Sequence, residues 1–222
     1  MPKLRLRFLR PVSFPLRRRR GPFALTPDGG AIYFTRFSPG EAAPSFFVSR
    51  LHEGTWSPPE KAVLPDGVAP APISFSPDGT RLYFTHLPDA SGHSRLWAAE
   101  PNGSDWKNAR PVGGDFEQWD ADHISPSATS DGTLYFVSNR REHAGGWGIY
   151  RSTPRDGAYQ EPVLVGGGLY TGISTLLHEI SVAASPDGSF LVFSSVAAPN
   201  GFGGADLYLA EFPTAEQGRA RA

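Results

Sequence analysis

The chain has 222 residues and a mass of 24.0 kDa, with 25 glycines, 22 prolines and a formal net charge of −1. The absence of cysteine excludes disulfide bonds, thiolate catalysis and cysteine-ligated metal centres. No apolar run approaches the roughly 20 residues that a membrane-spanning helix needs, so we expect a soluble chain. The glycine and proline content is typical of many short elements joined by tight turns, which favours an all-β fold.

The chain begins with a basic arm, residues 1–20, that contains eight basic residues and no acidic one. The other 202 residues carry 13 basic and 22 acidic side chains, so an acidic body follows the arm. Within the arm, KLRLRF alternates basic and apolar side chains with period two, which is typical of a half-buried strand. Pro11, Pro15 and the Arg17–Arg20 run interrupt the apolar stretch that a signal peptide requires, so we expect no signal peptide in this segment.

A short turn sequence recurs along the rest of the chain. It reads Pro-Asp-Gly three times and Ser-Asp-Gly once, with intervals of 50, 53 and 56 residues between its aspartates, which are Asp28, Asp78, Asp131 and Asp187. Proline presets φ, aspartate bonds to the backbone of the turn, and glycine adopts positive φ without a clash, so each sequence predicts a hairpin turn. A repeat of about 50 residues is typical of a propeller blade.

Each turn is followed by the same order of expected strands. A continuous apolar run comes first, at 32–35, 82–85, 134–137 and 191–194, and such runs are typical of strands buried on both faces. A second run follows at 46–48, 96–98, 149–151 and 207–209. In three units an aromatic residue then lies 28 residues after the aspartate, at Trp56, Trp106 and Tyr159. With the strand before the turn, each unit predicts four strands, and we expect the recurring tryptophans in the core, namely Trp56, Trp97, Trp106 and Trp147.

These units resemble the WD40-like β-propeller repeat of the TolB type. The third unit carries the resemblance best, with DADHISPSATSDGTLYFVSNR, GGWGIYRS and RDGAYQEPV, and the fourth continues it with HEISVAASPDG and GFGGADLYLAEF. The resemblance implies an all-β propeller of about four four-stranded blades within residues 21–212. We expect the blades at about 21–66, 67–115, 120–168 and 176–212, followed by a polar tail at 213–222. Proteins of this type are often periplasmic or secreted, whereas the sequence itself leaves the compartment open.

The basic arm occupies the sequence position of a strand that the fourth unit lacks. Counting 28 residues from Asp187 reaches a polar segment without an aromatic strand. Leu6, however, lies 22 residues before Asp28, which is the spacing of Trp56 before Asp78. The arm is therefore a candidate closing strand of the last blade, and such a strand would remove an exposed sheet edge. Two alternatives stay open: a closed four-bladed ring, or part of a six-bladed propeller with an open edge or an oligomer.

The candidate site residues lie at the start of the innermost strands, which face the central channel in this repeat type. In the third and fourth units they are Asp122, His123, His178 and Glu179. They predict a ligand-binding site at the channel mouth and, more weakly, a metal site with oxygen and nitrogen ligands. Asp122, Glu179 and His178 are the alternative catalytic set for a hydrolase. The competing interpretation, which we favour, is structural, because carboxylates at such positions usually bond to neighbouring backbone.

Other polar clusters have two interpretations as well. The segment DFEQWDAD predicts either a cation or partner site or a solvated blade connection, and we favour the connection; its acidic residues are Asp115, Glu117, Asp120 and Asp122. Asn139, Arg140, Arg141 and Asp206 match loop residues of the TolB-type repeat, and we expect them to hold their loops. No nucleophile elbow, zinc-protease helix motif or phosphate-binding loop is present, so no cofactor is predicted.

These observations predict a non-catalytic binding or scaffolding propeller that recognises a protein or other ligand at the channel mouth or top face. The alternative is a propeller hydrolase that acts on a glycan or a peptide. A protein or a small ligand is the expected partner, and the acidic body argues against nucleic acid. An oligomer is expected only if the ring is open. The choice of function rests on the resemblance, since propellers of one fold serve many functions.

Overall fold

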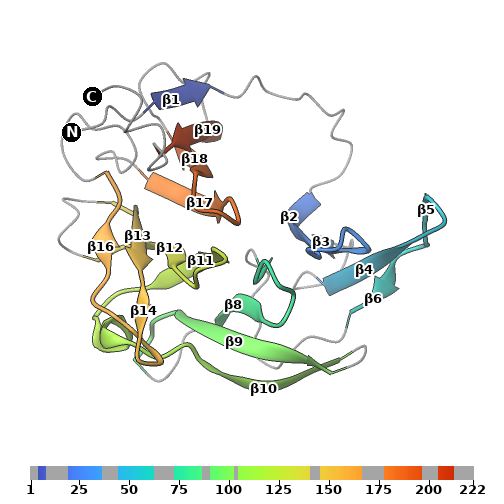
Figure 1. Ribbon diagram of the computed structural model, residues 1–222, viewed down its shortest axis with the longest axis horizontal. Helices are drawn as coiled ribbons and strands as arrows, with labels where there is room; N and C mark the ends of the chain where they lie inside the picture. Colours follow the sequence, from blue (N-terminus) through green and yellow to red (C-terminus); the bar gives the residue numbers. More distant parts are fainter. Residues whose placement is uncertain are drawn as a thin grey trace.

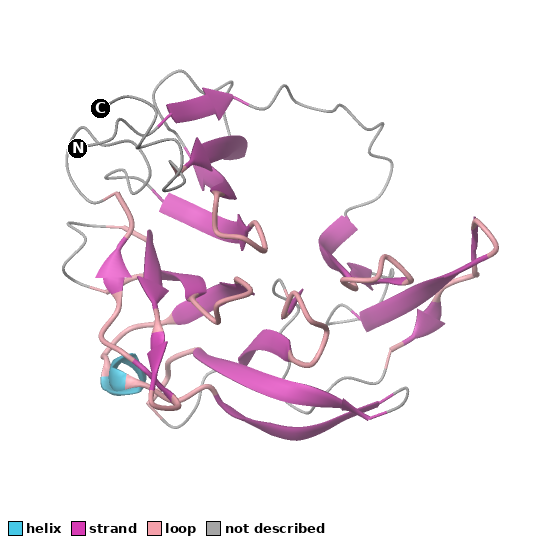
Figure 2. Cartoon of the chain, in the orientation of Figure 1, coloured by secondary structure: helices cyan, strands magenta, loops and turns pink. Residues whose placement is uncertain are grey.

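The computed structural model describes residues 5–8, 20–36, 45–62, 73–86, 91–102, 105–140, 146–166, 178–196 and 205–212. Their strands form four antiparallel sheets around a common centre, which is a four-bladed propeller arrangement (Figure 1). One short 3-10 helix, η1 (Asp115–Gln118), is the only helix in these ranges (Figure 2). Within the described part of the chain, no helix has the length and apolar character to cross a membrane. The predicted all-β propeller is confirmed.

Blades one and two come from the first half of the chain. Blade one contains β2 (Arg20–Leu25), β3 (Ala31–Arg36), β4 (Ser45–His52), β5 (Thr55–Trp56) and β6 (Glu60–Lys61). Blade two contains β7 (Ser74–Phe75), β8 (Leu82–His86), β9 (Arg95–Asn102) and β10 (Asp105–Pro111). Strands pair in chain order, and β2 and β7 lie nearest the centre (Figure 1).

Blades three and four follow the same plan. Blade three contains β11 (His123–Ala128), β12 (Leu134–Ser138), β13 (Gly148–Ser152) and β16 (Val163–Leu164), with a hairpin of β14 (Pro154–Arg155) and β15 (Ala158–Tyr159). Blade four contains β17 (His178–Ala184), β18 (Phe190–Val196), β19 (Ala205–Glu211) and β1 (Arg5–Phe8). The strand orders are β11-β12-β13-β16 and β17-β18-β19-β1.

The fourth strand of blade four therefore comes from the other end of the chain. β1 pairs antiparallel with β19, with Arg5 opposite Glu211 and Phe8 opposite Tyr208 (Figure 1). This ladder covers the outer edge of β19, whose backbone groups would otherwise lack a strand partner. Arg17, Arg18 and Arg19 and the tail 213–222 lie outside the described residues.

The repeated turns have the conformation that their sequence predicts. The four glycines after the aspartates have φ between 70° and 83°, and they are Gly29, Gly79, Gly132 and Gly188. In blade two, Asp78 Oδ1 accepts hydrogen bonds from Ser76 Oγ at 2.6 Å and from Thr80 N at 3.0 Å. These bonds favour the ionised form and lower the pKa of Asp78. Each turn thus ties its own two strands together.

Three hydrophobic clusters hold the blades together, one at each seam between neighbours. The first lies between blades one and two, the second between blades two and three, and the third between blades three and four. Strand β12 contributes to two of them, because successive side chains point to opposite faces. Leu134 and Phe136 pack toward blade two, and Tyr135 and Val137 pack toward blade four. The prediction that these continuous runs are buried on both faces is confirmed in β12.

The blades form an arc with one open side. Neighbouring blades contact each other through β2 and β7, through β8 and β11, and through β11 and β17. No comparable contact joins β2 to β17 within the described ranges, and the two strands lie apart in Figure 1. Blades one and four therefore each have a single neighbour among the described blades.

The expected burial of the tryptophans is correct for three of the four. Trp97 and Trp106 pack against the cluster between blades one and two, and Trp147 packs against the cluster between blades three and four. Trp56 was expected in the core, and this was wrong, because its exposed fraction is 44%. It lies on β5, which pairs with the far end of β4 at the end of the arc, where no further blade covers it (Figure 1).

Candidate functional site

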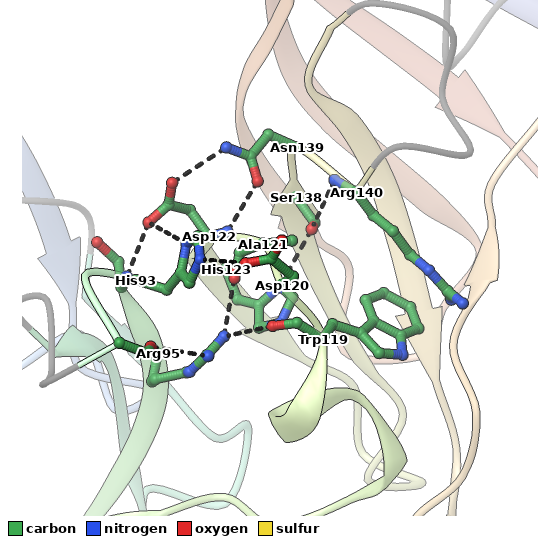
Figure 3. A network of polar contacts seen from close by, with 12 residues as sticks. His93, Arg95, Trp119, Asp120, Ala121, Asp122, His123, Ser138, Asn139 and Arg140 are labelled. Atoms are coloured by element: carbon green, nitrogen blue, oxygen red, sulfur yellow. Dashed lines mark hydrogen bonds and ion pairs between the residues drawn. The ribbon is translucent and has the colours of Figure 1, made fainter.

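The candidate site at the channel mouth of blade three is centred on Asp122, directly before the innermost strand β11. Asp122 Oδ1 accepts a hydrogen bond from Ser94 N at 2.7 Å, and Asp122 Oδ2 accepts one from Asn139 Nδ2 at 3.0 Å (Figure 3). Asp122 N donates to Asn139 Oδ1 at 2.7 Å. Ser94 belongs to blade two and Asn139 follows β12 in blade three, so this carboxylate joins the two blades.

Further bonds from blade two fix the connection that precedes Asp122. Arg95 Nη1 donates to the backbone oxygens of Trp119 and Ala121 at 3.1 and 2.8 Å (Figure 3). His93 Nε2 lies 2.8 Å from Asp120 Oδ1. The start of β9 thus holds the connection between blades two and three. This agrees with the interpretation of DFEQWDAD as a blade connection, in which the acidic side chains have structural partners.

His123 lies on the other side of the strand and is completely buried. Its Nε2 lies 3.0 Å from Phe116 O and its Nδ1 lies 3.1 Å from Ser138 Oγ (Figure 3). Since a carbonyl oxygen only accepts, Nε2 carries the proton and Nδ1 accepts from the Ser138 hydroxyl. Burial lowers the pKa of His123 to about 4, so the ring is neutral at neutral pH. The structure therefore does not bring His123 together with the Asp122 carboxylate.

We expect this buried histidine to make the fold sensitive to mild acid. Its pKa falls from 6.5 to about 4 on folding, so the stability it contributes is complete above pH about 6.5 and is lost as pH falls through about 4. The full difference corresponds to about 3 kcal/mol in the free energy of unfolding. Urea unfolding at several pH values, with the parent and a His123→Gln variant, measures the effect.

The His123→Gln side chain retains an N–H donor for Phe116 O but does not titrate, so its stability should change less over this pH window. The turn aspartates titrate lower, because the pKa values of Asp28, Asp78 and Asp131 lie below their ordinary value of 3.8. Equal losses of stability in parent and variant would contradict the prediction.

The candidate residues of blade four lie on β17. Glu179 is 1% exposed, and its Oε1 accepts a hydrogen bond from Ser195 Oγ at 3.3 Å. His178 pairs through its backbone with Val196, and its side chain lies outside the described residues. Among the residues that the structure describes, no group of three His, Asp or Glu side chains is placed to hold a metal ion. The ligand, metal and catalytic roles of Asp122, His123, His178 and Glu179 stay predictions.

The connection also presents an aromatic and cationic pair at the surface. The guanidinium carbon of Arg140 lies 3.4 Å from the centroid of the Trp119 ring, and Arg140 Nη1 lies 2.7 Å from Glu161 Oε1 (Figure 3). The Asp120 side chain beside this pair is 78% exposed. The sequence did not reveal the pair, because Trp119 and Arg140 are brought together only by the packing of the connection on blade three.

Comparisons with known proteins identify the fold and no family. No family model and no curated protein matches the chain. Among solved structures, TolB from Acinetobacter baumannii is similar with 20% sequence identity and a TM-score of 0.50, over 86% of this chain and 43% of that one. The gluconolactonase XC5397 from Xanthomonas campestris is similar with 18% identity and a TM-score of 0.50, over 83% and 54%.

A third similar structure is a puromycin hydrolase S511A mutant, with 15% identity and a TM-score of 0.52, over 84% of this chain and 26% of that one. The fold is that of a β-propeller. The chain spans about half or less of the length of these three structures. They include TolB as well as two hydrolases, so the likeness supports the fold and does not choose between binding and catalysis.

Proposed function

We propose that this chain is a non-catalytic binding or scaffolding propeller of the TolB-like type, which recognises a protein at the channel-mouth face of blade three. The observation that supports this most is the state of Asp122, because both of its carboxylate oxygens accept hydrogen bonds from within the protein. A general acid or base needs an oxygen that is available to a substrate. His123 is likewise neutral, buried and bonded on both ring nitrogens.

The adjoining surface has the chemistry of a recognition site. Trp119 and Arg140 form a stacked pair, Asp120 is exposed beside them, and Glu161 bonds to the guanidinium. Aromatic and arginine side chains are enriched at protein interfaces, where they act as anchors. The repeat grammar that resembles TolB-type propellers supports the same assignment, and the hydrolases among the similar structures supply the alternative.

Two measurements test this function. In the first, the purified chain is used to capture partners from an extract of its own cells, beside an Arg140→Ala variant and a control variant, Arg155→Ala. Arg155 is an exposed arginine on β14, away from Trp119. We expect a specific protein to be retained by the parent and the control, and to be retained about tenfold less by Arg140→Ala. Equal retention by all three would contradict the proposed face.

In the second measurement, the parent and an Asp122→Ala, Glu179→Ala double variant are assayed with chromogenic glycosides, lactones and peptides. We expect no turnover by the parent. Turnover by the parent that is lost in the double variant, with cooperative thermal unfolding retained, would overturn the proposal and favour a propeller hydrolase. Thermal unfolding of each variant shows whether the loss of the blade-joining bonds has affected the fold.

A further inference from the structure

Blades two and three enclose a groove at the turn end of their seam, away from Asp122. The repeated turns of both blades and the β14–β15 hairpin border it, and its volume is about 580 Å³. A smaller cavity of about 140 Å³ adjoins it beside β9 and β10. Volumes of about 300–1,000 Å³ are typical of small-molecule sites. The residues that matter here are Pro77, Arg81, Tyr83, Val112, Pro154 and Tyr159.

Two buried tyrosine hydroxyls lie at the inner end of the groove. Tyr83 is 4% exposed and Tyr159 is 7% exposed, and their hydroxyl oxygens are 3.4 Å apart. Each hydroxyl has one proton, and a bond between them uses only one of the two. The pair therefore retains one O–H donor without an acceptor among the described residues. Both side chains line both cavities, and burial raises the pKa of Tyr159, so this donor is present at neutral pH.

A cation lies next to this hydroxyl pair. Arg81 lines both cavities, and its positive charge opposes the rise in the pKa of Tyr159. Within the described part of the chain, no carboxylate forms an ion pair with Arg81. The nearest acidic groups are already bonded elsewhere: Asp78 accepts from Ser76 and Thr80, and Glu100 accepts from Asn108 Nδ2 at 2.9 Å. The groove therefore combines an unpaired guanidinium with an unused O–H donor.

Apolar surface makes up much of the remaining wall. Pro77 belongs to the turn of blade two, Val112 follows β10, and Pro154 begins β14. The methyl group of Ala128 and the rings of the two tyrosines extend this surface. A ligand that fits this environment has one anionic end that accepts several hydrogen bonds and an uncharged apolar body.

We propose that this groove binds a small organic carboxylate with an apolar body, with the carboxylate on Arg81 and on the spare hydroxyl of the Tyr83–Tyr159 pair. A carboxylate accepts two parallel bonds from a guanidinium, which fixes its orientation. The apolar body then lies against Pro77, Val112 and Pro154. This site is separate from the channel-mouth face and does not depend on the function proposed for that face.

The test uses N-acetyl-L-phenylalanine as the probe and its primary amide, which has nearly the same shape without the charge, as the reference. Isothermal titration of the full chain should show saturable binding of the acid and at least about tenfold weaker binding of the amide. Arg81→Gln should weaken the acid about tenfold and leave the amide nearly unchanged. Tyr159→Phe should weaken the acid several-fold, because it removes one of the two hydroxyl protons.

Two control variants locate the effect. Arg155→Gln removes the same charge from the adjoining hairpin at a residue that does not line either cavity, and Arg140→Ala alters the channel-mouth face. Both should bind the acid as the parent does. Arg81 is exposed, so its replacement should leave thermal unfolding unchanged. Equal binding of acid and amide, unchanged binding by Arg81→Gln, or no saturable binding of the acid by the parent would overturn the proposal.

Discussion

Replacement of Phe116 by alanine is expected to lower the free energy of unfolding by about 3–5 kcal/mol. Phe116 lies in η1, in the connection between blades two and three, and is 1% exposed. Its ring stacks on Phe136 with centroids 5.0 Å apart and meets the edges of His123 and Tyr159 at 5.5 and 6.4 Å. Truncation removes this burial and leaves a cavity at the seam, because β12 and β15 are fixed by their own sheets.

Urea unfolding followed by tryptophan fluorescence measures this loss. The matched control is Phe23→Ala on β2, whose side chain is 69% exposed, and its free energy of unfolding should change by less than about 0.5 kcal/mol. A Phe116→Ala protein within about 1 kcal/mol of the parent would show that the aromatic cluster does not hold this seam.

Removal of residues 1–12 is expected to abolish cooperative thermal unfolding or to cause association. The truncation deletes β1, so the edge of β19 from Ala205 to Glu211 loses its strand partner. Unpaired strand edges add strands from other molecules. Light scattering for the solution mass and a thermal melt, each on the parent and on the truncated chain, measure the two outcomes.

The control is a full-length chain with Arg5→Thr and Arg7→Thr, which removes charge from the arm but keeps residues that suit a strand. It should have the solution mass and the melting behaviour of the parent. If the truncated chain also matches the parent, the pairing of β1 with β19 contributes nothing to the closure of blade four, and an anionic partner for the basic arm becomes the better hypothesis.

The blades were predictable because local sequence determines them. The turn around Asp78 and Gly79 forms from its own side-chain bonds and its own positive φ, without help from other blades. The run Leu134–Val137 is continuous because blades lie on both sides of it. Trp56 has the same spacing in sequence as Tyr159, yet only Tyr159 has a neighbouring blade to cover it. Burial at the end of the arc depends on neighbours that a repeat pattern does not describe.

The candidate site was predictable only in part. The position of Asp122 at the start of an innermost strand followed from the repeat, but its partner Ser94 lies on another blade. Asp122 and His123 were expected to share the channel mouth. Adjacent residues in extended backbone point to opposite sides, so only one of them faces that end, and the other enters the core. That alternation was available in the sequence and is the signal that separates the two residues.

The groove at the turn end required the three-dimensional arrangement. Tyr83 belongs to an apolar run and Tyr159 to an aromatic position of the repeat, so each has an ordinary role in its blade. Their hydroxyls meet because neighbouring blades place β8 and β15 side by side across the seam. The unpaired state of Arg81 follows from bonds that hold the nearby acidic groups inside blade two.

The placement of the three hydrophobic clusters makes this propeller behave as a linear array. Each blade is stabilised by itself and by its nearest neighbours, as in repeat proteins whose stability is a sum of unit and interface terms. The two inner blades have two interfaces each, whereas the outer two have one among the described residues. Local opening therefore begins at the ends, and amide hydrogens exchange most slowly in β8, β11 and β12, where the central seam protects them.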